Sequence, residues 1–115
     1  MFDTETELSR AIRDALTGLD YVWCMRINAG GYRGRMVGAP KGTSDLVACV
    51  SVIENHGHYY AEHGLFVALE VKLPGCKTSP AQDAFARRIR ALGGVYEVVT
   101  SVDEALRVVR EVHDG

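Results

Sequence analysis

The sequence predicts an α/β fold with a mixed sheet between helices, in a single domain spanning residues 1–115. Two observations support this prediction. Residues 46–53 and 65–73 form nearly continuous apolar runs, as central strands buried on both faces do. Other segments repeat apolar residues at helical spacing behind recognisable N-caps. Because strands buried on both faces need cover on each side, we expect helices on both faces of the sheet.

The N-terminal part predicts a helix and then a strand. Thr4 and Glu7 have the spacing of a capping box, and apolar residues follow at helical spacing. Residues 21–28 are aromatic and β-rich, which predicts a strand with Trp23 in the core. Five glycines within residues 30–42 then indicate a long mobile loop.

The rest of the chain completes the predicted order α-β-β-β-α-β-α. The polar segment 54–64 separates the two apolar runs and predicts an antiparallel hairpin. Ser79, followed by Pro80, predicts the start of a second helix. Residues 95–99 predict a fourth strand, and Ser101 is placed to cap a last helix.

Charge and composition narrow the class of protein. No apolar run is long enough to span a membrane, no secretion signal is visible, and the three cysteines form no framework, so we expect a cytoplasmic protein with reduced thiols. The net charge of -2 argues at first against nucleic acid. Yet residues 21–44 carry four basic and no acidic side chains, and residues 71–91 carry five basic and one acidic. Such local stripes can contact phosphates.

Three charged residues are expected to converge. Asp45 lies at the start of the second predicted strand, and Glu70 and Lys72 lie near the end of the third. Antiparallel pairing and the two-residue period of a strand would gather them on one face. Two carboxylates, the Val71 carbonyl and waters would suit Mg²⁺, which prefers oxygen ligands. A salt bridge between Lys72 and either carboxylate is the alternative.

The surrounding motifs resemble a known family. Four segments, Gly42-Thr43-Ser44-Asp45-Leu46, Glu70-Val71-Lys72, Ser79-Pro80-Ala81-Gln82 and Gly93-Gly94-Val95-Tyr96, occur in the order and at the spacing of the VRR-Nuc (virus-type replication-repair nuclease) branch of the PD-(D/E)xK nuclease superfamily. The resemblance extends from about Thr4 to Leu106. It implies a restriction-endonuclease-like α/β/α core and catalysis with Mg²⁺, for which Mn²⁺ can substitute.

The resemblance also implies roles for individual residues. Asp45 and Glu70 match the acidic metal ligands, and Lys72 matches the lysine that positions or activates the attacking water. Gln82 matches the helix glutamine of the active site, and Glu7 resembles an N-terminal glutamate that faces the metal. For Gln82 and Glu7, backbone capping is an equally good explanation.

DNA contacts are expected from the basic segments. The candidates are Tyr32, Arg33, Arg35, Lys41 and Lys77. The tyrosine can stack on a base or sugar, and the cations can contact phosphates. Three histidines within residues 56–63 suggest zinc, but an exposed turn explains them better because no cysteine partner is close in sequence.

Together these observations predict a metal-dependent DNA endonuclease. The resemblance implies the stand-alone form found in phages and prophages, acting as a homodimer on branched, Holliday-junction-like DNA. Two alternatives stay open. One is a nuclease of the same fold that acts on flaps, ends or duplex DNA, and the other is an inactive DNA-binding accessory protein.

Overall fold

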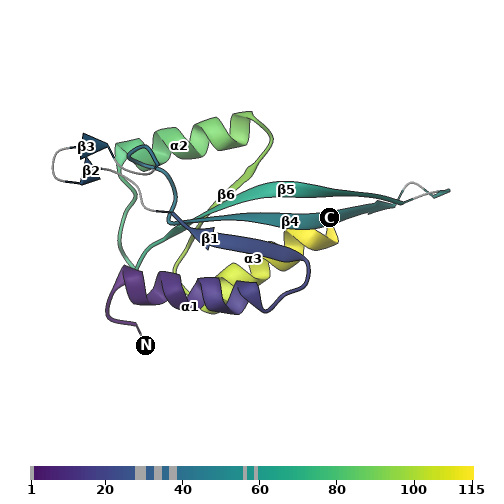
Figure 1. The fold of residues 1–115 in the computed structure, drawn as a ribbon, viewed down its shortest axis with the longest axis horizontal. Coiled ribbons are helices and arrows are strands. Elements are labelled where there is room, and N and C mark those ends of the chain that lie inside the picture. The colour runs from purple at the N-terminus through teal and green to yellow at the C-terminus, as the bar shows by residue number, and fades with distance from the viewer. Residues whose placement is uncertain (1, 28–30, 33–34, 37–38, 56, 59) are drawn as a thin grey trace.

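The computed structural model describes residues 2–27, 31–32, 35–36, 39–55, 57–58 and 60–115. These residues form a mixed α/β fold with a four-stranded sheet and three helices (Figure 1). The elements in chain order are α1 (Glu5–Thr17), β1 (Val22–Arg26), β2 (Gly31–Tyr32), β3 (Arg35–Met36), β4 (Leu46–Asn55), β5 (Tyr60–Val71), α2 (Pro80–Ala91), β6 (Val95–Val99) and α3 (Val102–Asp114). The predicted α/β class, with helices on both faces of a mixed sheet, is confirmed.

The main sheet has the strand order β1-β4-β5-β6. The first two pairs are antiparallel and the pair β5-β6 is parallel. The predicted hairpin between the two apolar runs is therefore confirmed, but it is longer than its apolar residues indicated. Its two strands continue to the pair Asn55 and Tyr60, so its tip projects beyond the other strands (Figure 1).

Helices α1 and α3 cover one face of the sheet and enclose the main core (Figure 1). Both begin as predicted. The Thr4 hydroxyl oxygen accepts a hydrogen bond from the Glu7 backbone N–H, and the Ser101 hydroxyl oxygen accepts one from Glu104. The buried core on this face comprises Leu8, Ile12, Leu16, Leu46, Ala48, Val50, Val67, Leu69, Val71, Val99, Ala105, Val108 and Val109. This face follows the ordinary rule that apolar side chains lie inside.

Helix α2 lies on the opposite face, where it packs over β5 and β6. Its buried cluster there is small and consists of Ala68, Ala86 and Tyr96, with Phe85 and Ile89 packed against it. Strands β1 and β4 therefore have one open face. The expectation of burial on both faces is confirmed for residues 67–71 of β5, which lie under α2, and is wrong for β4, which is buried on one face. The expectation that Trp23 lies in the core is also wrong, because one helix is too narrow to cover four strands: Trp23 is 62% exposed.

The glycine-rich segment 30–42 was expected to be a loop. Its described residues instead include β2 and β3, which pair antiparallel in a separate two-stranded sheet. No helix in the described part of the chain is long and apolar enough to cross a membrane.

Candidate metal and phosphate site

The β4-β5 pairing brings Asp45 and Glu70 together. Leu46 pairs with Leu69, so one step further along the antiparallel ladder Asp45 lies opposite Glu70. Directly opposite residues point to the same face, which here is the α2 face, because Leu46 and Leu69 point to the α1-α3 core. The predicted convergence of the two carboxylates follows from this register.

Glu70 is the unusual member of the pair. It is only 1% exposed, and its Oε1 atom has no hydrogen-bond partner among the residues that the structure describes. Burial, a hydrogen bond with Asp45 and the negative charge of Asp45 raise the pKa of Glu70 to about 9, while the Lys72 ammonium lowers it. A buried carboxyl oxygen without a partner costs stability, so this position suits a group that binds a cation.

Asp45 is fixed by the backbone around it. Its Oδ2 accepts a hydrogen bond from the Val71 N–H at 2.8 Å, and its own carbonyl oxygen accepts one from the Ile27 N–H at 2.8 Å. The first bond ties the start of β4 to the end of β5. One oxygen of Asp45 is thereby oriented by the sheet, and the backbone of Val71 lies against the carboxylate pair.

The turn that leads into Asp45 packs against the start of α2. Gly42 has φ +91°, and a Cβ built there would lie 2.5 Å from the Ala81 carbonyl oxygen. Only glycine allows both that backbone conformation and that approach. Ser44 is fully buried, and its hydroxyl donates to the Leu46 carbonyl at 2.8 Å. The close approach of Gly42 to Ala81 and the hydrogen bond from Ser44 to Leu46 therefore both fix the turn that leads into Asp45.

Lys72 follows directly after β5. Its backbone N–H donates to the Val99 carbonyl at 3.1 Å, which continues the parallel ladder with β6. The two-residue period puts its side chain on the same face as Glu70, and its positive charge acts on that carboxyl. The structure therefore brings Asp45, Glu70 and Lys72 to one place on the sheet.

Tyr96 is a site residue that the sequence analysis did not assign. It pairs with Ala68 in β6, it is 3% exposed, and within the described part of the chain its hydroxyl has no hydrogen-bond partner. Burial and the negative charges of Glu70, Asp83 and Asp45 raise the pKa of Tyr96 to about 12. Two buried polar groups thus lie within electrostatic reach of each other under α2. The signal available in the sequence was the alternation of β6, which places a tyrosine hydroxyl on the α2 face.

Gln82 and Glu7 both take part in helix capping. The Gln82 Oε1 accepts a hydrogen bond from the Ser79 N–H at 2.8 Å, within a complete capping box. Glu7 is exposed, and its Oε2 accepts from the Asp3 N–H at 3.4 Å. Gln82 stands at the start of α2, near the turn at Gly42 that leads into Asp45. Both side chains therefore cap their helices, and Glu7 lies at the surface.

Glu5 is the acidic residue of α1 whose charge reaches the site. It is half-buried, and its charge contributes to the raised pKa of Glu70. Helical spacing could have identified Glu5 as the residue of α1 that faces the sheet. Glu5 precedes the buried residues Leu8 and Ile12 by three and seven positions, whereas Glu7 does not share their face.

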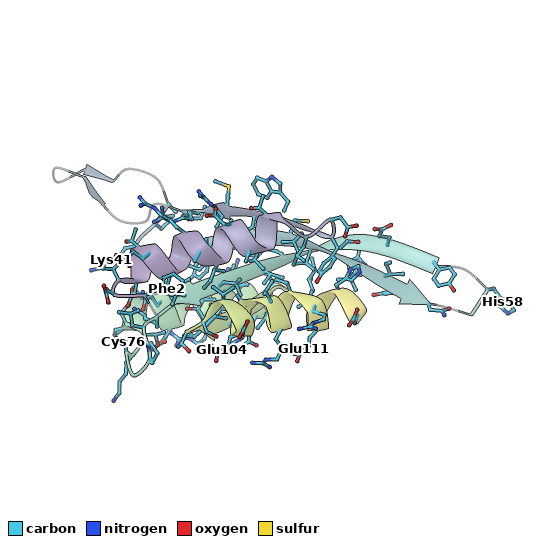
Figure 2. The ribbon with its side chains drawn as sticks, turned by 90° about the horizontal axis from the view of Figure 1, so that it is seen from below. Phe2, Lys41, His58, Cys76, Glu104 and Glu111 are labelled. Atoms are coloured by element: carbon cyan, nitrogen blue, oxygen red, sulfur yellow. The ribbon has the colours of Figure 1, made fainter. Side chains whose placement is uncertain are left out.

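Among the predicted DNA contacts, the side chains of Lys41 and Lys77 are described by the structure, and both lie at one end of the molecule. Lys41 and Lys77 are exposed, and Figure 2 shows Lys41 and Cys76, the neighbour of Lys77, at the end opposite His58. Tyr32 and Arg35 belong to β2 and β3, but their side chains lie outside the described residues, as does the whole of Arg33.

The donor set of this centre fits Mg²⁺ better than zinc. Among the residues that the structure describes, no group of three or more His, Cys, Asp or Glu side chains is close enough to hold a metal ion. Mg²⁺ commonly takes only one or two carboxylates and fills the remaining positions with water and substrate phosphate. Asp45 and the unpartnered Oε1 of Glu70 can supply such a pair.

Comparison of the chain with models of protein families, with curated proteins and with solved structures finds no match. The function is therefore inferred from the geometry of Asp45, Glu70 and Lys72.

Proposed function

We propose that this protein is a metal-dependent DNA endonuclease of the VRR-Nuc type, with a restriction-endonuclease-like core. The observation that carries the proposal is the buried Glu70, whose Oε1 lacks a partner among the described residues, beside Asp45 and Lys72 at one end of the sheet. An acidic pair that needs a cation, next to a lysine that can meet a phosphate, suits phosphodiester hydrolysis.

Asp45, Glu70 and the Val71 carbonyl would hold a Mg²⁺ ion, or Mn²⁺ in its place. When bound, the ion lowers the pKa of water and polarises the phosphoryl group. The hydrogen bond from the Val71 N–H orients Asp45 before any ligand arrives. Such preorganisation lowers the cost of assembling the site.

Lys72 is the proposed catalytic lysine. Its ammonium would orient the attacking water and offset negative charge on the phosphate oxygens. In the reaction, the attacking water would lose one proton as its oxygen bonds to phosphorus, the bond from phosphorus to one sugar oxygen would break, and the leaving oxygen would take up one proton, so that the proton count balances. The Tyr96 hydroxyl, which has no partner in the described part of the chain, would donate a hydrogen bond within the same centre. Gln82 and Glu5 would support the centre from α2 and α1.

The proposed substrate is branched DNA, cut by a homodimer. Exposed Lys41 and Lys77 lie at the end of the molecule that holds the carboxylate pair. Together with Tyr32, Arg33 and Arg35, they would contact the DNA backbone. Two identical centres suit the two symmetric cuts that a four-way junction requires.

Cleavage of labelled DNA tests the proposal. We expect Mg²⁺-dependent cleavage of a four-way junction. Lys72→Ala and Asp45→Asn should each lose at least about 10³-fold, because the first removes a positive charge that stabilises the transition state and the second removes a charged ligand of the metal ion. Flap and plain duplex substrates run beside the junction decide among nucleases of the same fold. Removal of Mg²⁺ with a chelator should abolish all cleavage.

Glu111→Gln provides the matched control. Glu111 is an exposed carboxylate on α3 that pairs with Arg107 at 3.5 Å, far from the centre, so this variant should cut like the wild type. Equal cutting by wild type, Lys72→Ala and Asp45→Asn would show that this is not the active site. If the wild type binds DNA and cuts none of the three substrates, the accessory DNA-binding function is correct instead.

A further inference from the structure

Arg26 is a cation at the end of the sheet that the proposed site does not yet include. It is the last residue of β1 and pairs with Leu46 of β4. The next residue, Ile27, donates its backbone N–H to the Asp45 carbonyl oxygen at 2.8 Å. Arg26 therefore lies one strand away from the start of β4, where the carboxylate pair begins. Its side chain shares the α1 side of the sheet with Leu46, because directly opposite residues point to the same face.

A buried hydroxyl of α1 holds the Arg26 side chain. Ser9 is 3% exposed, and its Oγ accepts a hydrogen bond from the Arg26 Nε at 3.3 Å. A buried hydroxyl requires a partner, and Arg26 supplies it. The bond joins α1 to β1 and restricts the rotamers of a long side chain. The guanidinium is therefore held at a defined place beside the end of the sheet.

The bond to Ser9 leaves most of the guanidinium available. This group is planar and has five N–H donors, of which only the one on Nε points at Ser9. The four donors on the two Nη atoms have no partner among the residues that the structure describes. Arg26 is partly exposed, so a ligand can reach these atoms. Two parallel N–H groups at the end of a guanidinium match two oxygens of a phosphate.

Two further arginines lie on the flank of α1 that faces β1. Helix α1 and strand β1 run side by side in opposite directions (Figure 1). Arg13 follows Ser9 by four positions and lies near Cys24 of β1: burial raises the pKa of Cys24 to about 11, and the positive charge of Arg13 opposes that rise. Arg10 is exposed and precedes Arg13 by three positions. Asp14 pairs with Arg13 at 3.1 Å, but an exposed ion pair is weak enough for a phosphate to compete.

We name Arg10, Arg13 and Arg26 the basic edge. Its cations follow one another along α1 and β1, as phosphates follow one another along a nucleic-acid strand. The negative charge nearby belongs to the carboxylate pair and to Glu5 on α1, at the end of the sheet where the metal ion is proposed to bind. A DNA strand that passes the carboxylate pair can therefore continue along the basic edge.

We infer that Arg26, held by Ser9, binds a backbone phosphate of the DNA with the two Nη atoms of its guanidinium, and that the same strand continues past Arg13 and Arg10. The inference rests on the proposed function for the identity of the ligand as DNA. Arg26 is a binding residue, and Ser9 is a positioning residue that acts through it. Phosphate contacts of this kind fix the register of DNA on a protein without reading its sequence.

Affinity for a fluorescent four-way junction, measured by anisotropy without divalent metal, tests the inference. Arg26→Ala should weaken binding about tenfold, because a charge-assisted pair of hydrogen bonds is lost. Arg26→Lys should still weaken it several-fold, since an ammonium keeps the charge without the planar fork. Ser9→Ala should weaken binding in the wild type and have no further effect in Arg26→Ala. Arg107→Ala, on α3 and paired with Glu111, is the matched control and should bind like the wild type.

Neutral phosphates locate the contact on the DNA. In junctions that each carry one methylphosphonate in place of a phosphate, one position should weaken wild-type binding about tenfold and leave Arg26→Ala binding unchanged. If Arg26 only joined α1 to β1, the variant would keep the full sensitivity at every position, and circular dichroism would show the loss of structure.

Three results would overturn the inference: wild-type affinity in Arg26→Ala, wild-type affinity in Arg26→Lys, or a methylphosphonate profile that Arg26→Ala does not change. The measurement requires no cleavage, so its outcome is separate from that of the cleavage experiment. A protein that passes this test and cuts no DNA with Mg²⁺ would contradict the nuclease activity alone. A protein that cuts DNA and fails this test would contradict the role of Arg26 alone.

Discussion

The two faces of the sheet differ in how they partition polar and apolar groups. On the α1-α3 face, the side chains of the main core are apolar and closely packed. On the α2 face, Glu70 and Tyr96 are buried with polar atoms that lack partners among the described residues, while Trp23 and Phe66 are exposed. The burial of apolar side chains for stability is enough to explain the main core of the α1-α3 face. On the α2 face, by contrast, polar groups are buried and apolar groups are exposed.

The catalytic groups of the protein are expected on the α2 face. A buried polar atom without a partner lowers stability, and an exposed apolar patch promotes association. Both features occur on the same face of the sheet. In the proposed function, a cation and a phosphate satisfy the buried polar atoms. If so, substitutions on the α2 face should change stability and activity in opposite directions, as substitutions in the α1-α3 core would not.

The largest effect is expected at Glu70. Glu70→Gln should reduce cleavage about 10³-fold. The same change should raise the free energy of unfolding of the metal-free protein at neutral pH by about 1–3 kcal/mol, because a neutral amide replaces a buried carboxyl and can donate to Asp45. Glu97→Gln, an exposed carboxylate of β6, is the control and should alter neither quantity. A destabilised Glu70→Gln protein would contradict the view that Glu70 is held at a cost.

The pH dependence of stability follows from the same residue. The pKa of Glu70 is raised in the folded protein to about 9, so between its ordinary value near 4.3 and about 9 the folded state binds more protons than the unfolded state. The contribution of Glu70 therefore lowers stability as pH rises through this window. Denaturant unfolding of the metal-free protein should show a weaker decline in Glu70→Gln than in the wild type.

Gly42→Ala should have the next largest effect. The substitution requires a left-handed backbone for alanine and drives its Cβ into the Ala81 carbonyl, so the free energy of unfolding should fall by about 3 kcal/mol. Gly75→Ala is the matched control: Gly75 has φ +87°, a Cβ there would meet no described atom within 4 Å, and the change should cost only about 1 kcal/mol. Urea unfolding measures both. Equal losses would show that the close approach at Gly42 is unimportant.

Tyr96→Phe should raise stability and slow cleavage, and both changes should be smaller than those at Glu70. Removal of a buried hydroxyl without a partner should raise the free energy of unfolding by about 1 kcal/mol, and loss of its hydrogen bond to the bound phosphate or water should slow cleavage about tenfold. Tyr60→Phe, a 73% exposed tyrosine at the tip of the hairpin, is the control. Unchanged cleavage in Tyr96→Phe would remove Tyr96 from the proposed site.

The smallest effect is expected from Lys77→Ala. Loss of one phosphate contact should weaken DNA binding a few-fold and reduce the slope of log affinity against log salt by about one. Arg107→Ala, on α3 and paired with Glu111, should leave both quantities unchanged. Fluorescence anisotropy at several salt concentrations measures them. A preserved salt slope in Lys77→Ala would place the DNA elsewhere.

Much of the fold was predictable because its signals are local. Capping at Thr4, Ser79 and Ser101 depends on residues three positions apart, and the structure has these bonds. The β6 range 95–99 was predicted in full, since a short apolar strand between two helices leaves few choices. The juxtaposition of Asp45 with Glu70 also followed from a hairpin whose apolar runs fixed its register.

Other features depend on which elements meet. Nothing local distinguishes an exposed Trp23 from a buried one, because the difference is whether a helix crosses above β1. The choice between Glu5 and Glu7 depends on the face that α1 turns toward the sheet. The pairing of β2 with β3 was hidden by glycines, which permit a loop and a hairpin equally.

Periodicity and capping act over a few residues, so they were enough to predict the helices, the strands of the main sheet and the chemical set of Asp45, Glu70 and Lys72. The joint burial of Glu70 and Tyr96, and the half of one sheet face that stays open, depend instead on how the elements pack together. Burial is a property of packed elements, and α2 covers two strands of four. The uncovered half and the buried polar pair are therefore consequences of the same packing.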